Sequence, residues 1–142
     1  LIIFFGDHEP KIEESFYEEI EKGYKLDDVY KNLKKRNIQF VIWANYDMKS
    51  DNNMYISANR MSSLVLETAG LAQNGYQQFV SEFSKKVPII TKKGYIGEDG
   101  NYYKTGDKTS PYYEWIHNYD ILQYNNIFGT KNRVQDLYKI AQ

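Results

Sequence analysis

The chain has 142 residues, enough to bury one hydrophobic core, and its 42% hydrophobic and 26% charged residues are ordinary for a soluble globular protein. The formal net charge of -1 argues against nucleic-acid binding, because neutralising phosphates needs a surplus of Lys and Arg. Cysteine is absent, which excludes disulfides and thiolate chemistry and fits either a reducing cytoplasm or a cysteine-poor exported protein. No stretch approaches the roughly 20 apolar residues that a membrane-spanning helix needs.

The chain opens on a short apolar run, residues 1–5, which Gly6 ends. Continuous apolarity over this length is typical of a central parallel strand that is covered on both faces. Natural domains seldom begin within such a strand, and neither a methionine nor a leader precedes it. We therefore expect an excised fragment, with the N-terminal part of the domain holding most of the sheet.

The next segments predict two helices and a second strand. Residues 11–36 are highly charged with apolar residues at loose helical spacing, and Gly23 divides them into two short predicted helices. Residues 38–44 are rich in β-branched and aromatic side chains and predict a strand. The polar residues 45–53 predict a loop.

The rest of the chain predicts four helices, over 57–70, 76–85, 111–124 and 132–141, and a hairpin over 95–103. Ser57 is suited to cap the first of these helices, and Gly70 to end it. The hairpin rests on the turn signal Asp99-Gly100. Strands and helices in this order indicate an α/β fold.

Gly6-Asp7-His8 is the sharpest local feature, because an aspartate and a histidine directly follow the first predicted strand. Open α/β sheets bind ligands at such strand ends, and Gly6 lets the backbone turn so that both side chains converge on one point. A carboxylate oxygen and an imidazole nitrogen suit manganese or zinc, whereas magnesium prefers oxygen ligands throughout. The alternative is a plain turn in which Asp7 caps nearby backbone groups, and the tripeptide alone favours that alternative.

Other candidate residues carry weaker signals. His117 lies in a predicted helix, where packing or surface exposure is favoured over metal binding. The acidic residues between 13 and 21 predict a solvated helix face. Asp47, Asp51 and Asn53 resemble a calcium loop in composition but lack the glycine and terminal glutamate of an EF-hand. The 14 tyrosines would suit a sugar-binding surface, but packing is their commoner role.

Residues 3–10, Ile-Phe-Phe-Gly-Asp-His-Glu-Pro, resemble the strand and G-D-H-x-P motif of the sulfatase superfamily. The resemblance is to its branch of lipoteichoic acid synthases and phosphoglycerol transferases. Later segments resemble that branch in the same order, namely residues 40–47, 56–63 with 66–71, and 119–129. Two positions depart from the pattern: Glu9 stands where leucine is common, and Ile38-Gln39 where a Thr-Pro pair often precedes the strand. Neither departure removes a metal ligand.

The resemblance implies an alkaline-phosphatase-like α/β fold, a mixed sheet flanked by helices with a C-terminal hairpin, of which residues 1–142 form the C-terminal part. It implies that Asp7 and His8 bind the catalytic divalent metal, manganese first, with magnesium, zinc or calcium as alternatives. The family's threonine nucleophile and remaining acidic ligand lie upstream of this motif and have no counterpart here. No catalytic residue is therefore assigned within this chain, which we expect to be inactive by itself.

For the intact bacterial parent, the resemblance implies phosphoglycerol transfer to a cell-envelope lipid or glycan, through a covalent intermediate. Its catalytic domain would be extracytoplasmic and tethered by upstream membrane helices, whereas this chain would be soluble and would bind no nucleic acid. The alternatives are a sulfatase, which needs an upstream cysteine or serine converted to formylglycine, and a non-catalytic domain that binds cell-wall glycans. An exposed strand edge at residues 1–5 would also favour self-association.

Overall fold

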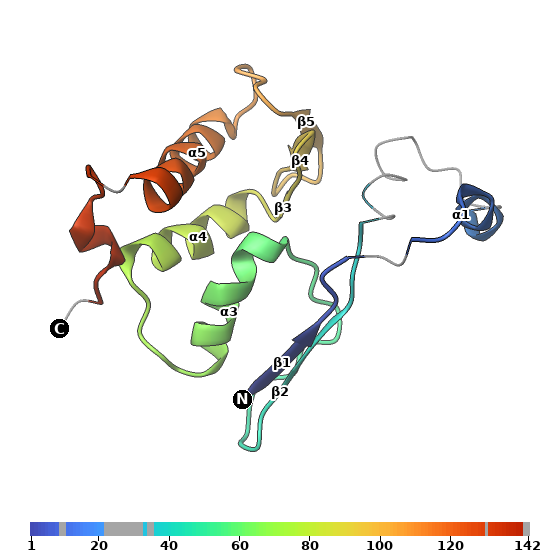
Figure 1. The fold of residues 1–142 in the computed structure, drawn as a ribbon, viewed down its shortest axis with the longest axis horizontal. Helices are drawn as coiled ribbons and strands as arrows, with labels where there is room; N and C mark the ends of the chain where they lie inside the picture. Colours follow the sequence, from blue (N-terminus) through green and yellow to red (C-terminus); the bar gives the residue numbers. More distant parts are fainter. Residues whose placement is uncertain (9–10, 22–32, 34–35, 130, 141–142) are drawn as a thin grey trace. The chain divides into compact units, whose positions relative to one another are not determined.

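The structure, a computed structural model, describes residues 1–8, 11–21, 33, 36–129 and 131–140. They belong to two compact units, residues 1–47 and 48–142, each of which is described by itself. The described residues form helices and small antiparallel sheets, so the chain belongs to the mixed α/β class that the sequence predicts (Figure 1). The expected mixed sheet is not formed within this part of the chain, where one sheet has two strands and the other three.

The first unit contains an antiparallel ribbon of β1 (Ile2–Phe5) and β2 (Phe40–Trp43), with Phe4 opposite Val41. The two predicted strands are confirmed. The expected parallel pairing and two-sided burial of the first strand are wrong, because β1 pairs antiparallel with β2 and Phe4 is 78% exposed. An apolar run favours a parallel strand covered on both faces, but the direction of the neighbouring strand and the cover of each face are set by contacts with other segments.

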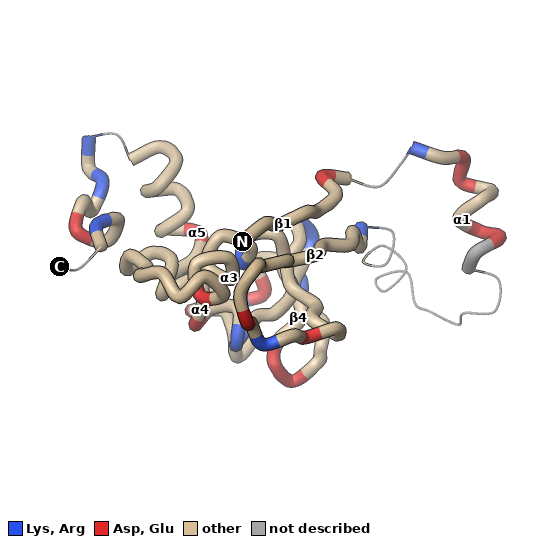
Figure 2. Tube along the Cα trace, turned by 90° about the horizontal axis from the view of Figure 1, so that it is seen from below, with Lys and Arg blue, Asp and Glu red and all other residues tan. Residues whose placement is uncertain are grey.

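Helix α1 (Glu14–Glu21) confirms the first of the two short helices predicted in the charged segment. Figure 2 shows red, acidic segments along α1, and Glu14, Glu18 and Glu19 are exposed. The solvated acidic face expected from the sequence is therefore present. The second helix, expected after Gly23, lies almost wholly outside the described residues.

The second unit holds three longer elements and several short ones: η1 (Ala58–Arg60), α3 (Met61–Thr68), α4 (Gly75–Lys86), β3 (Ile89–Ile90), β4 (Gly94–Ile96), β5 (Tyr102–Lys104), α5 (Tyr113–Phe128) and η2 (Gln135–Tyr138). Asn74 caps α4 in a capping box, exchanging hydrogen bonds with Gln77. The predicted hairpin is confirmed as β4 and β5, and β3 adds a third strand to it. Gly100 adopts a positive φ of 78° in the turn, which favours glycine.

Two details of the predicted helices are wrong. Ser57 makes no side-chain cap; instead its hydroxyl accepts a hydrogen bond from the backbone N–H of Ile90 at 2.7 Å and so joins η1 to β3. The last predicted helix is only the short 3-10 turn η2. The side chain of Asn125 bonds the backbone of Asn132 and Val134, which satisfies these groups in a non-helical conformation.

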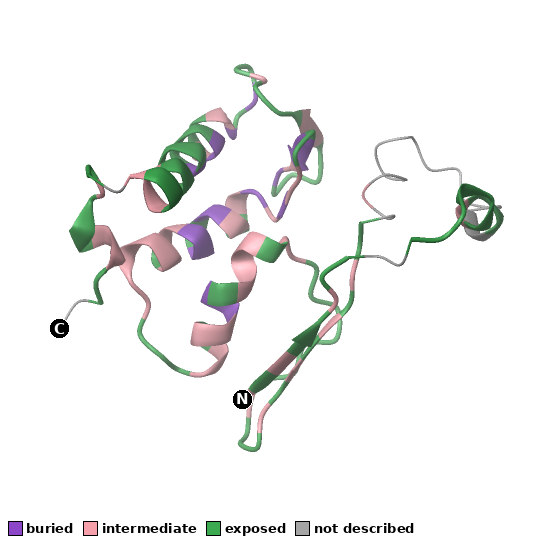
Figure 3. Ribbon diagram, in the orientation of Figure 1, coloured by how far each residue is buried: buried purple, intermediate pink, exposed green. Residues whose placement is uncertain are grey.

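The hydrophobic core lies between α4, α5 and the three-stranded sheet. Phe83 is 0% exposed, and its ring stacks on Tyr119 with centroids 4.6 Å apart. Tyr95 and Tyr112 are also buried, so the packing role expected for the tyrosines is confirmed at these positions. Figure 3 shows the buried residues on α3, α4, α5 and the sheet, whereas the described residues of the first unit contain none.

A polar network joins α3 to α4. Arg60 donates hydrogen bonds to Glu67 and, at 3.0 Å, to the hydroxyl of Ser81. That hydroxyl donates to Glu67 Oε1 at 2.7 Å, and the amide of Gln73 donates to the same oxygen at 3.1 Å. The side chain of Arg60 is 13% exposed and that of Glu67 is 41% exposed. The pair is therefore partly screened by solvent, while Arg60 depends on Glu67 for charge compensation.

We expect Glu67→Ala to lower the free energy of unfolding by about 1–3 kcal/mol at pH 7, less than for a fully buried pair because solvent screens Glu67. Burial alone would raise the pKa of Glu67, but hydrogen bonds from Arg60, Ser81 and Gln73 and the charge of Arg60 outweigh it and lower that pKa. A lowered folded-state pKa stabilises above the unfolded-state pKa, and this stabilisation is lost as pH falls through the folded-state pKa.

The difference between wild type and Glu67→Ala should therefore shrink below about pH 4, which urea unfolding at pH 7 and pH 3 would measure. Glu82→Ala is the matched control, because Glu82 is an exposed glutamate on α4 that pairs only at the surface with Lys85. Its removal should cost less than about 0.5 kcal/mol. Equal losses of unfolding free energy for Glu67→Ala and Glu82→Ala would contradict the conclusion that Arg60 depends on Glu67.

No helix among the described residues combines the length and the apolar character that crossing a bilayer requires.

Candidate functional site

Asp7 and His8 follow β1 after Gly6, and their side chains lie side by side, with His8 Nε2 3.7 Å from Asp7 Oδ2. Both are open to solvent, with 77% of the His8 side chain and 84% of the Asp7 side chain exposed. Two atoms that bind one ion at about 2.1 Å lie at most about 4.2 Å apart, so the observed spacing allows a shared ion. The oxygen and nitrogen donors suit manganese or zinc better than magnesium.

Gly6 does not have the role expected of it. Its N–H donates to the carbonyl of Gln39 at 3.3 Å and so continues the pairing of β1 with β2. Its φ lies outside the left-handed region, and an added Cβ would lie 3.6 Å from Ile38, an ordinary van der Waals contact. The end of the ribbon, and not a conformation restricted to glycine, therefore positions Asp7 and His8.

The described residues do not bring a third ligand to this pair. Among them no group of three or more His, Cys, Asp or Glu side chains is arranged to hold a metal ion. Glu9, the acidic residue next in sequence, lies outside the described residues. Asp7 and His8 are thus two ligands of a candidate metal site and not a complete one.

His117 is an exposed residue with a local packing contact, which agrees with the surface or packing role that the sequence favoured. Its ring stacks on Tyr113, one turn earlier on α5, with centroids 5.8 Å apart and planes 4° from parallel. Burial raises the pKa of the nearby Asp120, and the charge of His117 opposes that shift. These contacts explain His117 without a metal.

The segment that resembled a calcium loop forms a local turn. The backbone N–H of Asn53 donates to Asp51 Oδ1 at 2.9 Å, across two residues. This bond is an Asx turn, in which the carboxylate replaces a backbone acceptor. Composition alone accounts for the likeness to a calcium site.

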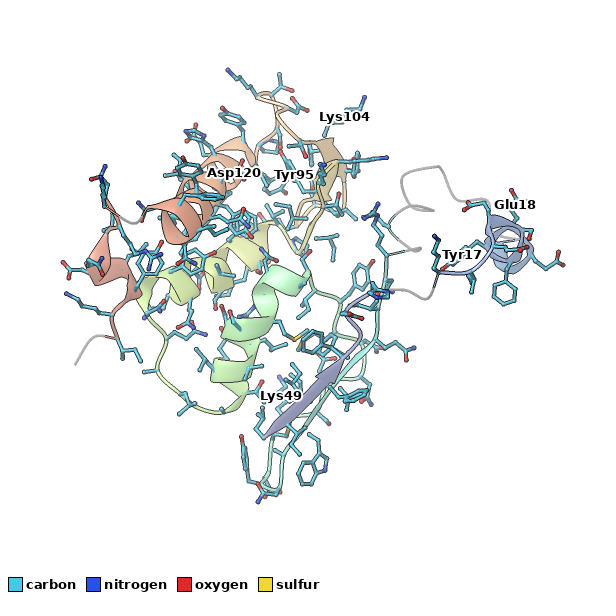
Figure 4. The ribbon with its side chains drawn as sticks, viewed as in Figure 1. Tyr17, Glu18, Lys49, Tyr95, Lys104 and Asp120 are labelled. Atoms are coloured by element: carbon cyan, nitrogen blue, oxygen red, sulfur yellow. The ribbon has the colours of Figure 1, made fainter. Side chains whose placement is uncertain are left out.

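The second unit contains a cavity that no sequence pattern predicts. It has a volume of about 460 Å³ and lies between η1, the β3–β4 sheet and α5. Figure 4 labels Tyr95 on β4 and Asp120 on α5, which line it from two different elements. The complete lining is Ser57, Ala58, Asn59, Ile90, Thr91, Lys92, Tyr95, Thr105, Ile116, Tyr119, Asp120 and Gln123.

Asn59 is the residue of this cavity that sequence reasoning missed. Both atoms of its side-chain amide are closed to solvent, and neither has a hydrogen-bond partner of ordinary geometry. Burial raises the pKa of Tyr119, and the approach of the Asn59 amide to its hydroxyl opposes that shift. The only sequence signal at Asn59 was its place in the segment 56–63, which resembles the phosphoglycerol transferases; no periodicity marks it.

Comparison of the chain with family models, with curated proteins and with solved structures finds no match.

Proposed function

We propose that residues 1–142 are the C-terminal part of a sulfatase-type catalytic domain of the phosphoglycerol transferase branch, in which Asp7 and His8 bind the divalent metal. The observation that carries this proposal is the pair at the end of β1, exposed and with donor atoms 3.7 Å apart. Supporting it, the segments 40–47, 56–63 with 66–71, and 119–129 resemble that branch in the same order. The alkaline-phosphatase-like fold is part of the same proposal.

The donor set fits manganese best among the divalent ions of this chemistry. Asp7 would contribute a negative charge to hold the cation, and His8 would bind it as the neutral imidazole. Such a cation would supply Lewis acidity, lowering the pKa of a nucleophile and offsetting charge on the substrate oxygens. The nucleophile and the remaining ligands belong, in this proposal, to the part of the domain that precedes residue 1.

The substrate class follows from the same resemblance. The intact protein would transfer phosphoglycerol from a phospholipid to a cell-envelope acceptor, with its catalytic domain outside the cytoplasm and anchored in the membrane. Residues 1–142 would contribute two metal ligands and a packed C-terminal unit, with no turnover of their own.

The test is the activity of the intact protein on vesicles of phosphatidylglycerol. We expect diacylglycerol to be released in the presence of Mn²⁺ and the release to stop when EDTA removes the metal, because the metal stabilises charge at the transferred group. Thin-layer chromatography of the lipid products measures both. Hydrolysis of p-nitrophenyl sulfate without diacylglycerol release would replace the transferase by a sulfatase, and diacylglycerol release unaffected by EDTA would contradict the metal site.

A further inference from the structure

Helix α5 carries an uncovered apolar stripe on the side opposite its core face. Ile121, Tyr124 and Phe128 are each more than half exposed, whereas Ile116 and Tyr119 of the same helix are buried. At about 3.6 residues per turn, the three exposed side chains share one side of the helix, and the two buried ones lie on the other. The stripe is therefore apolar surface that the described residues leave open to solvent.

The stripe has the spacing of a helix-pairing seam. His117 is exposed and extends it by one turn, and the rings of Tyr124 and Phe128 lie 5.1 Å apart at its other end. Positions 117, 121, 124 and 128 alternate between intervals of four and three residues, as the apolar positions of a heptad repeat do. Two helices with such a spacing pack along one seam, although a seam this short gives only weak pairing.

The same positions are self-complementary in an antiparallel pair. If two copies of α5 run in opposite directions about a twofold axis between Ile121 and Tyr124, Ile121 of each copy faces Tyr124 of the other, and His117 faces Phe128. This register also places Glu114, at the start of the helix, beside Lys131, which follows its end. The twofold axis repeats each of these contacts, so both ends of the seam would carry an ion pair.

The charges favour this direction of pairing. Glu114 and Lys131 are exposed, and neither belongs to an ion pair among the described residues. The amide of Asn125 donates to the carbonyl of Asn132 at 3.1 Å, which holds the segment after α5 against the C-terminal half of the helix. Asp120 would face the uncharged Asn125 of the second copy. A parallel pair would instead bring like charges together at both ends.

We infer that the stripe on α5 binds a second copy of this chain in an antiparallel dimer. The exposed parts of Ile121, Tyr124 and Phe128 amount to about 350 Å² of surface per copy, which is small beside a standard interface of about 1,200–2,000 Å² in total. The association is therefore weak, with a dissociation constant between about 10 μM and 1 mM. The stripe shares no residue with Asp7, His8 or β1, so this dimer depends neither on the proposed function nor on pairing at a strand edge.

Sedimentation equilibrium of the 142-residue chain between about 10 μM and 1 mM measures the dimer. Ile121→Lys should weaken it at least about tenfold, because two lysine charges would meet in the seam. Leu71→Lys is the matched control, since Leu71 is also more than half exposed but lies outside α5, and it should change the dissociation constant less than about twofold. Phe4→Lys should do the same, which separates the α5 seam from self-association through β1.

A charge exchange tests the antiparallel register. Glu114→Lys and Lys131→Glu should each weaken the dimer about threefold or more at low salt, because each places like charges together at both ends of the seam. The double variant should return to within about twofold of wild type, since it restores both ion pairs with their signs exchanged. Equal melting temperatures check that the variants fold, and Tyr124→Lys replaces Ile121→Lys if that variant does not. No dimer at about 1 mM, a dimer unaffected by a lysine in the seam, or no recovery in the double variant would each overturn the inference.

Discussion

Alanine at Asp7 or at His8 in the intact protein should lower manganese-dependent diacylglycerol release at least about a hundredfold. Loss of a group that only orients a metal ligand already costs roughly 10–100-fold in affinity or activity, and each of these changes would remove a ligand itself. The two donor atoms lie 3.7 Å apart, so neither residue can replace the other at the ion. Turnover of phosphatidylglycerol and the manganese content of each purified variant are the measurements.

His117→Ala and Asp136→Ala are the matched controls for this experiment. His117 stacks on Tyr113, and Asp136 is 91% exposed and pairs with Lys139. Both should retain turnover within about twofold, because neither is a ligand in the proposed metal site. Wild-type turnover and manganese content in Asp7→Ala and His8→Ala would remove the basis of the proposed function.

Phe83→Ala should lower the free energy of unfolding by about 3–5 kcal/mol, the usual cost of removing a fully buried ring. Phe83 is 0% exposed, stacks on Tyr119 at 4.6 Å and lies 6.1 Å from the ring of Phe79. Its removal leaves a cavity between α4 and α5 that neighbouring rigid rings cannot fill. Urea unfolding followed by near-ultraviolet circular dichroism of the tyrosines would measure the loss.

Phe128→Ala provides the comparison, because Phe128 is 62% exposed at the end of α5, where it contacts only the neighbouring ring of Tyr124 among the aromatic side chains described. Its removal should cost less than about 1 kcal/mol. A loss for Phe83→Ala no greater than that for Phe128→Ala would show that the second unit is not held together by this core.

The elements that could be predicted are those whose signals are local. The strand at residues 1–5, the helix ended by Gly70 and the Asp99-Gly100 hairpin were found because each follows from side chains a few residues apart. The prediction of a helix over 132–141 was wrong for a related reason. The backbone carbonyl of Asn132 and the N–H of Val134 bond the side chain of Asn125, and no local pattern reveals a partner from another element.

For the candidate metal pair, too, the local features could be predicted from the sequence and the long-range ones could not. Asp7 and His8 could be named from the sequence because they are adjacent and follow a strand. The role expected of Gly6 was wrong, because its φ and its neighbours place no demand for glycine there. A third ligand could not be named, since ligands of one ion usually come from distant parts of a chain.

By itself, therefore, the sequence determined the mixed α/β class, the positions of most helices and strands, and the adjacent donors Asp7 and His8. Only the tertiary structure decided that β1 runs antiparallel to β2, that Arg60 is compensated by Glu67, and that Asn59 and Asp120 line one cavity. The physical reason is the distance along the chain over which each kind of interaction acts. Periodicity and turn chemistry act over a few residues, whereas strand direction, charge compensation and cavities depend on contacts between segments that only the folded chain brings together.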